Sequence, residues 1–205
     1  MLYTNVLSEE QKTLLPFIQS FEKEYYLVGG TAIALQVGHR ESIDFDMFKL
    51  GNVSKNKIIK RIEAFGLTYK LIYANAESFH IMIDGVKITF FQFPFKVPVK
   101  KTSLGIKMPS LLDLAGMKAY ALGRRAKWKD YFDLYVILKD FHDLESIIKA
   151  AEPIFKQLFS AKLFRQQLCY FKDIDHTEEI TLIAENSDTE EDVKAFLTSI
   201  ATKHI

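Results

Sequence analysis

The chain has 205 residues, of which 48% are hydrophobic and 26% are charged, and its formal net charge is +1. This is the composition of an ordinary soluble globular protein, and its near-neutral charge gives no overall attraction to nucleic acid, although a local basic patch is compatible with it. The single cysteine, Cys169, cannot form an internal disulfide, and no apolar run is long enough to span a membrane. We therefore expect a cytoplasmic protein without a membrane partner, built as one sizeable domain or two small ones.

The first half of the sequence alternates helix and strand patterns. Ser8 can cap a helix that runs to Phe21, because apolar residues recur there at helical spacing. Gly66 ends a second amphipathic helix that begins at Ser54. Asp84-Gly85 is a strong two-residue hairpin signal. The remaining predictions are strands over Tyr25–Val28, Ile43–Phe48, Thr68–Ala74, Ser78–Ile83 and Val86–Phe93, a short helix over Thr31–Val37, and a proline-containing connector over Pro94–Pro109.

Beyond the connector, strand patterns stop and only helical patterns remain. They cover Ser110–Arg125, Trp128–Phe141, Leu144–Leu158, Ala161–Tyr170 and Glu190–Lys203. We therefore expect an α/β (α+β) fold. Residues 1–98 would form an α/β core with an N-terminal helix, and residues 99–205 a helical half that completes an active-site cleft.

Two short motifs, each after an apolar run, carry the chemistry of the first half. Gly29-Gly30-Thr31 can place bare backbone N–H groups against phosphate oxygens. Asp44 and Asp46 alternate with Ile43, Phe45 and Met47, so the two carboxylates share one face of a strand and the apolar side chains share the other. Together, a phosphate cradle and a carboxylate pair are the minimal apparatus for a metal-dependent reaction on a nucleoside triphosphate. Separately, a plain strand-to-helix turn and an exposed strand edge would explain them equally well.

A lysine in the second half of the sequence independently supports a site for a nucleoside triphosphate. Lys118 lies in the middle of an apolar helical stripe formed by Leu111, Leu114, Ala115, Ala121 and Leu122. A lysine that points toward a core either snorkels out to water or meets an anion, here the oxygens of a triphosphate.

A basic run follows, from Arg124 to Lys129, and it is either a solvated corner or a patch for phosphates. Asp130 and Asp133 then share a helix face, and Lys129 offers Asp133 an ordinary i,i+4 ion pair. Asp130 is therefore favoured as the functional acid of the two. Arg40, before the aspartate strand, can meet a phosphate or pair with Glu41.

With these residues assembled, the chain resembles the AbiEii/AbiGii-type toxin nucleotidyltransferases, a family of the polymerase-beta-like superfamily. The resemblance implies a core with a mixed sheet. It further implies Gly29 and Gly30 as the nucleotide-binding turn and Asp44 and Asp46 as metal ligands. We expect Thr31 to bind phosphate beside that turn and the metal to be Mg²⁺ or Mn²⁺. The matching segments are LVGGTAIALQVGHRESIDFDMF, KITFFQFPF, DLAGMKAYALGRRAKWKDYFDLYVIL and AKLFRQQLCYFKDID.

The resemblance also implies Lys118 and Asp130, or alternatively Asp133, as catalytic residues. From the residues themselves we expect Arg40 and Lys129 near the substrate. The implied reaction moves a nucleoside monophosphate from an NTP to an acceptor, which for some family members is the 3′ end of tRNA. The implied setting is a toxin–antitoxin or phage-defence system, in which a cognate antitoxin protein would be a partner. Many superfamily members carry a third carboxylate on a neighbouring strand, and the corresponding strand here, from Lys87 to Gln92, has no acid. The alternatives are an inactive nucleotide- or partner-binding protein, or transfer to a small molecule or a protein hydroxyl.

Overall fold

In a computed structural model, which describes residues 2–183 and 188–203, the chain divides into two compact units, Met1–Ser110 and Leu111–Ile205. The first unit is built on a five-stranded mixed sheet and the second is helical within its described residues. The predicted α/β class is therefore confirmed. None of the described helices is long and apolar enough to cross a membrane.

The sheet of the first unit has the order β1-β2-β5-β4-β3. β2 and β5 run parallel at its centre, and the remaining neighbours are antiparallel. The elements are η1 (Thr4–Val6), α1 (Glu9–Gln19), β1 (Tyr26–Val28), α2 (Gly29–Val37), β2 (Asp44–Lys49), α3 (Lys55–Ala64), β3 (Lys70–Ala74), β4 (Ser78–Ile83) and β5 (Val86–Gln92).

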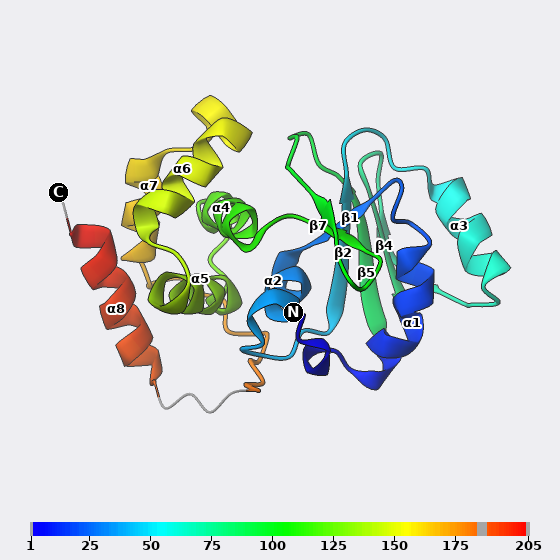
Figure 1. Ribbon diagram of the computed structural model, residues 1–205, viewed down its shortest axis with the longest axis horizontal. Coiled ribbons are helices and arrows are strands. Elements are labelled where there is room, and N and C mark those ends of the chain that lie inside the picture. The colour runs from blue at the N-terminus through cyan, green and yellow to red at the C-terminus, as the bar shows by residue number, and fades with distance from the viewer. Residues whose placement is uncertain (1, 184–187, 204–205) are drawn as a thin grey trace. The chain divides into compact units, whose positions relative to one another are not determined.

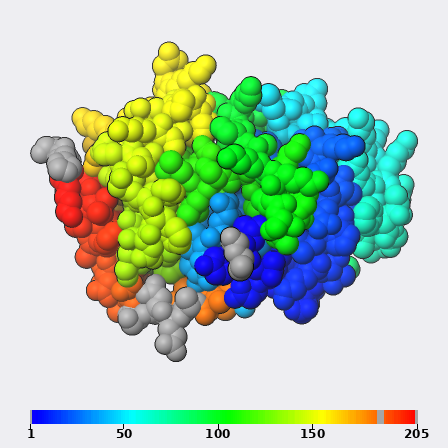
Figure 2. Space-filling view, in the orientation of Figure 1, coloured from blue at the N-terminus to red at the C-terminus, as the bar shows by residue number. Residues whose placement is uncertain are grey.

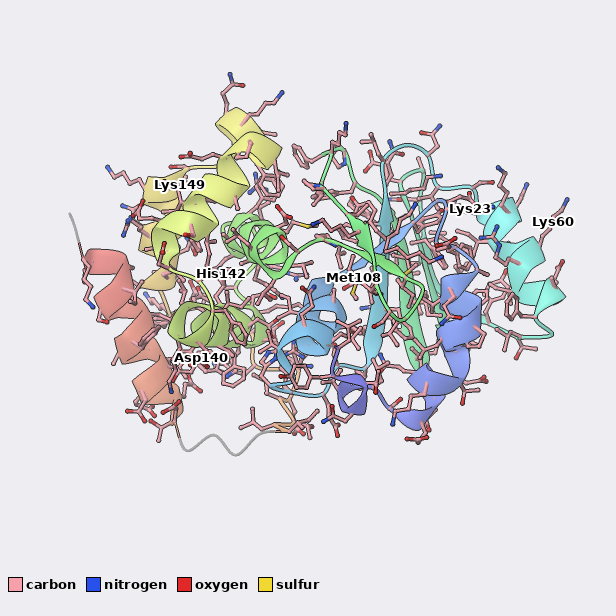
Figure 3. The ribbon with its side chains drawn as sticks, viewed as in Figure 1. Lys23, Lys60, Met108, Asp140, His142 and Lys149 are labelled. Carbon is pink, nitrogen blue, oxygen red and sulfur yellow. The ribbon has the colours of Figure 1, made fainter. Side chains whose placement is uncertain are left out.

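One face of this sheet forms the core of the unit. Figure 1 shows α1 and α3 on this face and α2 on the opposite one. Phe21, just after α1, packs against Phe90 of β5 with ring centroids 4.9 Å apart. On α3, Ile58 and Ile62 are buried, whereas Lys60 points outward into solvent (Figure 3). The opposite face is consequently the one left to polar side chains of the central strands.

Local sequence signals account for several element boundaries. Ser8 caps α1 through a capping box with Gln11, as its position before the apolar pattern predicts. Asp84 and Gly85 both have positive φ, at 48° and 80°, and connect β4 to β5 in the predicted two-residue hairpin.

Two boundaries differ from the predictions. The helix expected from Thr31 begins at Gly29, so the glycines form the first turn of α2 instead of a separate loop. The alternation places Ile43 on the apolar face of the aspartate strand, but this residue precedes β2 and its side chain is 59% exposed. The apolar face of β2 therefore begins with Phe45, which is fully buried together with Met47.

The connector between the units contains structure that the sequence patterns did not predict. β6 (Lys100–Lys101) and β7 (Lys107–Met108) form a small antiparallel sheet. It is held to the α1 region by an ion pair of Lys101 with Glu22 at 2.8 Å and by a hydrogen bond from Gln19 to the Leu104 carbonyl. Figure 2 shows this green segment lying against the blue N-terminal part of the chain.

The helices of the second unit follow the predicted order. Gly116 of α4 lies against the backbone of α6, where an added Cβ would be 3.1 Å from the Ala151 nitrogen, so the glycine permits a close helix crossing. The elements are α4 (Leu111–Leu122), α5 (Trp128–Asp140), α6 (Leu144–Phe155), η2 (Lys156–Leu158), α7 (Ala161–Leu168) and α8 (Glu190–Thr202).

Candidate active site

The first glycine of α2 lies directly against the second aspartate of β2. Val28 and Asp46 are cross-strand partners of β1 and β2, and Gly29 continues the chain from Val28 into the helix. A Cβ built on Gly29 would stand 2.3 Å from Oδ2 of Asp46, and Gly29 has a φ of +73°, which side chains disfavour. Only glycine therefore allows the helix start and this carboxylate to approach so closely.

The next residues bind α2 to the beginning of β2. The hydroxyl of Thr31 donates to the backbone carbonyl of Asp44 and lies 2.7 Å from the hydroxyl of Ser42. Thr31 is 2% exposed. Its side chain thus forms a buried contact that holds the first turn of α2 against the backbone that carries the aspartates.

Arg40 fills the space beside the second glycine. Its guanidinium donates from Nη1 to the Glu41 carbonyl at 2.9 Å, and a Cβ on Gly30 would be 2.5 Å from Nη2. The residue is 2% exposed. Arg40 therefore places a buried positive charge beside the N-terminal turn of α2, and its partner on Glu41 is the backbone carbonyl.

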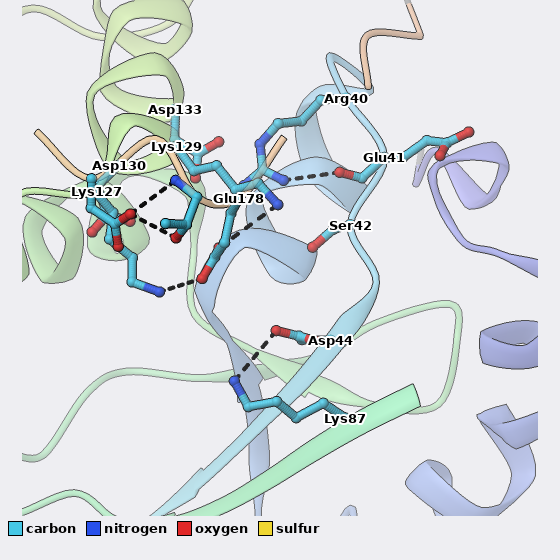
Figure 4. A network of polar contacts seen from close by, with 12 residues as sticks. Arg40, Glu41, Ser42, Asp44, Lys87, Lys127, Lys129, Asp130, Asp133 and Glu178 are labelled. Atoms are coloured by element: carbon cyan, nitrogen blue, oxygen red, sulfur yellow. Dashed lines mark hydrogen bonds and ion pairs between the residues drawn. The ribbon is translucent and has the colours of Figure 1, made fainter. Parts of the chain in front are cut away.

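The two aspartates project from the same side of β2. Asp44 and Asp46 alternate with the buried Phe45 and Met47, and both acids are partly exposed. Figure 4 shows Asp44 and Lys87 pointing toward one another from neighbouring strands. Lys87 Nζ is 3.7 Å from Asp44 Oδ2, with side chains 40% and 37% exposed.

The neighbouring strand supplies no acid to this face. β5 presents Lys87 and Thr89 there, because these residues pair in register with Asp44 and Asp46. His80 of β4 pairs with Thr89 on the same face, and burial together with Lys87 holds the pKa of His80 below its usual value. On the central strands β2 and β5, this face therefore combines two carboxylates with one ammonium, that of Lys87.

This donor set fits a divalent ion that a substrate helps to bind. Mg²⁺ in nucleotide enzymes is held by one or two carboxylates, with phosphate oxygens and water completing the octahedron. Within residues 2–183 and 188–203, no three His, Cys, Asp or Glu side chains are grouped as a metal site. Asp44 and Asp46 therefore match an ion that arrives with a nucleotide better than one held by the protein alone.

The helical unit contains a second pair of aspartates with different surroundings. Lys118 of α4 lies between Asp130 and Asp133 of α5, with its Nζ 2.8 Å from Asp130 Oδ1 and 2.9 Å from Asp133 Oδ2. All three side chains are buried, at 6%, 3% and 0% exposed. The snorkelling alternative for Lys118 is therefore wrong, and the anions that it meets include two carboxylates of its own unit.

Arg125 extends this network to the surface. Its Nε donates to Asp130 Oδ2 at 2.8 Å while its side chain remains 53% exposed. Burial alone would raise the pKa of Asp130, but Lys118 and Arg125 outweigh it and hold that pKa below its usual value. Asp130 therefore stays ionised and orients both an internal and an exposed cation.

The two lysines of this basic run contact Glu178. Lys127 pairs with Glu178 Oε1, and Lys129 Nζ is 3.7 Å from Glu178 Oε2 (Figure 4). Lys129 is only 17% exposed. Among the cations of the run, Arg124 and Arg125 are the exposed ones, and Arg124 lies over the Tyr120 ring with 3.5 Å between its Cζ and the centroid.

The structure thus brings Gly29, Gly30, Thr31, Arg40, Asp44 and Asp46 together in the first unit, and Lys118 and Asp130 together in the second, where Lys129 instead contacts Glu178. Sequence reasoning did not assign a role to Lys87 or single out Arg125. Lys87 is the one charged residue of its strand, and this was the only feature of the sequence that could have marked it as a functional residue.

Comparison with known proteins gives a family and a relative. The family model described as nucleotidyl transferase AbiEii toxin, type IV TA system, matches residues 69–203. An uncharacterised protein of Aquifex aeolicus (strain VF5) is 29% identical over 160 residues, which cover 70% of this chain and 74% of that protein.

Two solved structures share the fold. MenT4, a nucleotidyltransferase toxin of Mycobacterium tuberculosis H37Rv, has a TM-score of 0.63 at 11% identity and covers 94% of this chain and 81% of its own. JHP933 of Helicobacter pylori has a TM-score of 0.59 at 16% identity, with 95% and 91% covered.

Proposed function

Because the chain belongs to the AbiEii nucleotidyltransferase toxin family, we propose that it transfers a nucleoside monophosphate from an NTP to the 3′ end of tRNA. The observation that carries this proposal is the contact of Asp46 with Gly29, which sets a carboxylate pair beside the N-terminal turn of a helix. Backbone N–H groups of such a turn bind phosphate oxygens, and a carboxylate pair binds the cation that accompanies them.

The residues of the first unit have separate tasks in this reaction. The first turn of α2 orients the triphosphate, and Val28, which precedes it, has no side-chain oxygen to cap those N–H groups. Thr31 holds that turn in place from inside, and the buried Arg40 lies beside it. Asp44 and Asp46 bind Mg²⁺ or Mn²⁺, which supplies positive charge to the phosphates. The acceptor oxygen bonds to the α-phosphorus, the bond from that phosphorus to pyrophosphate breaks, and the hydroxyl proton leaves to solvent.

Direct catalytic roles for Lys118 and Asp130 stay a prediction. Their mutual contacts account for their burial within the helical unit without a substrate. The tRNA acceptor is supported by the exposed Arg124 and Arg125, since guanidinium groups bind phosphate well. A cytoplasmic location and a cognate antitoxin belong to the same proposal and follow from the toxin family.

The test is incubation of the protein with each α-³²P-labelled NTP, Mg²⁺ and total tRNA. We expect label on tRNA from one preferred NTP and none with the Asp44→Ala/Asp46→Ala variant. Parallel reactions with an aminoglycoside or with cell protein as acceptor separate the alternative targets. Label on one of those in place of tRNA would contradict the acceptor and leave the reaction intact.

One observation favours a second candidate, a nucleotide-binding protein without catalysis. The strand next to Asp44, on which many superfamily members carry a third acid, has none here, and the Lys87 ammonium lies close to Asp44. This candidate predicts NTP binding without Mg²⁺ and no release of pyrophosphate with any acceptor. Equilibrium dialysis with and without EDTA, beside the label transfer, distinguishes the two candidates.

A further inference from the structure

Lys87 occupies a defined place relative to the aspartate pair. β2 and β5 are parallel, and their register pairs Asp44 with Lys87 and Asp46 with Thr89. Side chains of paired residues point to the same face of a sheet. The ammonium consequently shares the face of both carboxylates, and its 3.7 Å distance to Asp44 Oδ2 makes it an ion-pair partner.

The charges around the pair argue against two closely spaced divalent ions. Two-metal sites for phosphoryl chemistry place their ions about 3.5–4 Å apart, and several carboxylates compensate the repulsion. On β2 and β5, two carboxylates face one ammonium, and the described residues group no third acid or histidine with them as a metal site. A second ion would be repelled by both the first ion and the Lys87 ammonium, and little negative charge is present to offset this repulsion.

We propose that Asp44 and Asp46 hold a single divalent cation and that the Lys87 ammonium takes the place of a second one. Lys87 is then a catalytic residue for the transfer, and this inference rests on the proposed function. Its positive charge faces the oxygen atoms that gain negative charge as the nucleotide bond forms and breaks. A tethered ammonium provides that charge without the extra carboxylate that a second ion would need.

The exposure of the pair is consistent with this role. Both side chains are more than one third exposed, so solvent screens their attraction and the contact is weak compared with the buried Lys118 network. Lys87 can therefore leave Asp44 when a nucleotide and its cation bind. A lysine that only stabilised the fold would gain little from an exposed pair of this kind.

The test counts bound Mn²⁺ by electron paramagnetic resonance of the free ion, without nucleotide and with one equivalent of an α,β-methylene NTP analogue. Wild type, Lys87→Met and Lys70→Met are compared. Lys70 is the matched control, because it is exposed and lies in the same cross-strand row through Met82 and Lys87, on the edge strand β3. Thermal unfolding checks that all three proteins are folded.

We expect one Mn²⁺ per chain with the analogue in wild type and in Lys70→Met. Lys87→Met should bind Mn²⁺ on the order of tenfold more tightly without nucleotide, because a divalent ion held by Asp44 and Asp46 would no longer be repelled by a neighbouring positive charge. Two ions in wild type, none in wild type, or equal affinities for Lys87→Met and wild type would each overturn the inference. If wild type transfers label to an acceptor but binds two ions, only this inference fails. If it transfers none, the proposed function fails.

Discussion

Two pairs of aspartates in the described part of the chain have opposite surroundings. Asp44 and Asp46 are partly exposed on a sheet, beside a glycine turn and one weakly held lysine. Asp130 and Asp133 are buried on α5, and Lys118 lies within 2.9 Å of both. A buried pair whose charge is already neutralised is costly to disrupt, whereas a pair left open to solvent is available to a cation and its nucleotide.

The largest expected effect is the difference in stability between variants of Lys118 and Lys87. Lys118→Met removes the ammonium from two buried carboxylates and should cost about 3–5 kcal/mol in the free energy of unfolding. Lys87→Met breaks an exposed pair and should cost less than about 1 kcal/mol. Urea unfolding at pH 7 measures both. Equal losses would contradict the distinction between a closed and an open pair.

The glycine turn gives a sharper test of geometry. Gly29→Ala should lower nucleotidyl transfer by about a hundredfold, because the new Cβ displaces the Asp46 carboxylate. Gly66→Ala is the matched control, since Gly66 has a similar φ of +65° but an added Cβ there would meet no atom within 4 Å. Both variants should lose about 1–2 kcal/mol of stability from backbone strain. A Gly29→Ala protein that transfers at the wild-type rate would refute the importance of this contact.

The closed pair should also make the helical unit sensitive to acid. The pKa of Asp130 lies below its ordinary value of 3.8, so its stabilising contribution is complete above pH 3.8 and is lost as the pH falls through the folded-state pKa. Asp130→Asn should therefore weaken the fall in stability below about pH 4. Asp140→Asn, an exposed change on the same helix, serves as the control. Thermal unfolding from about pH 2 to about pH 6 follows both variants across this window.

The smallest predicted effect lies on the open face. The pKa of His80 is held below 6.5, so the folded state resists its protonation and loses stability as the pH falls below that value. His80→Gln should flatten the stability profile between about pH 5 and 7, by a small amount because His80 is partly exposed. An unchanged slope in thermal unfolding over this range would show that His80 is not the group responsible.

Local patterns predicted the elements well, because they depend on neighbouring residues. The Ser8 cap, the Asp84-Gly85 hairpin and the alternation along β2 are all set within a few positions. The β6–β7 pair was missed since each strand has two residues, too few for any alternation to be visible.

Contacts between distant segments were beyond the sequence. No local sequence pattern indicates that Lys87 pairs with Asp44, because the register of β2 and β5 joins residues that are 43 positions apart (87 − 44). The sequence indicates that Lys118 needs an anion, but it does not show that Asp130 and Asp133 both supply a carboxylate to it. The glycine pair was read as a phosphate turn, whereas the need for Gly29 against Asp46 is a matter of tertiary packing.

The most direct test of the open pair is label transfer from an α-³²P-NTP by the Asp46→Asn protein, measured beside wild type after both are shown to be folded. The substitution keeps the size of the side chain and removes its charge. We predict that transfer falls by at least about a hundredfold while the unfolding midpoint stays close to that of wild type. A folded Asp46→Asn protein that transfers label at the wild-type rate would contradict the assignment of this pair to the chemistry.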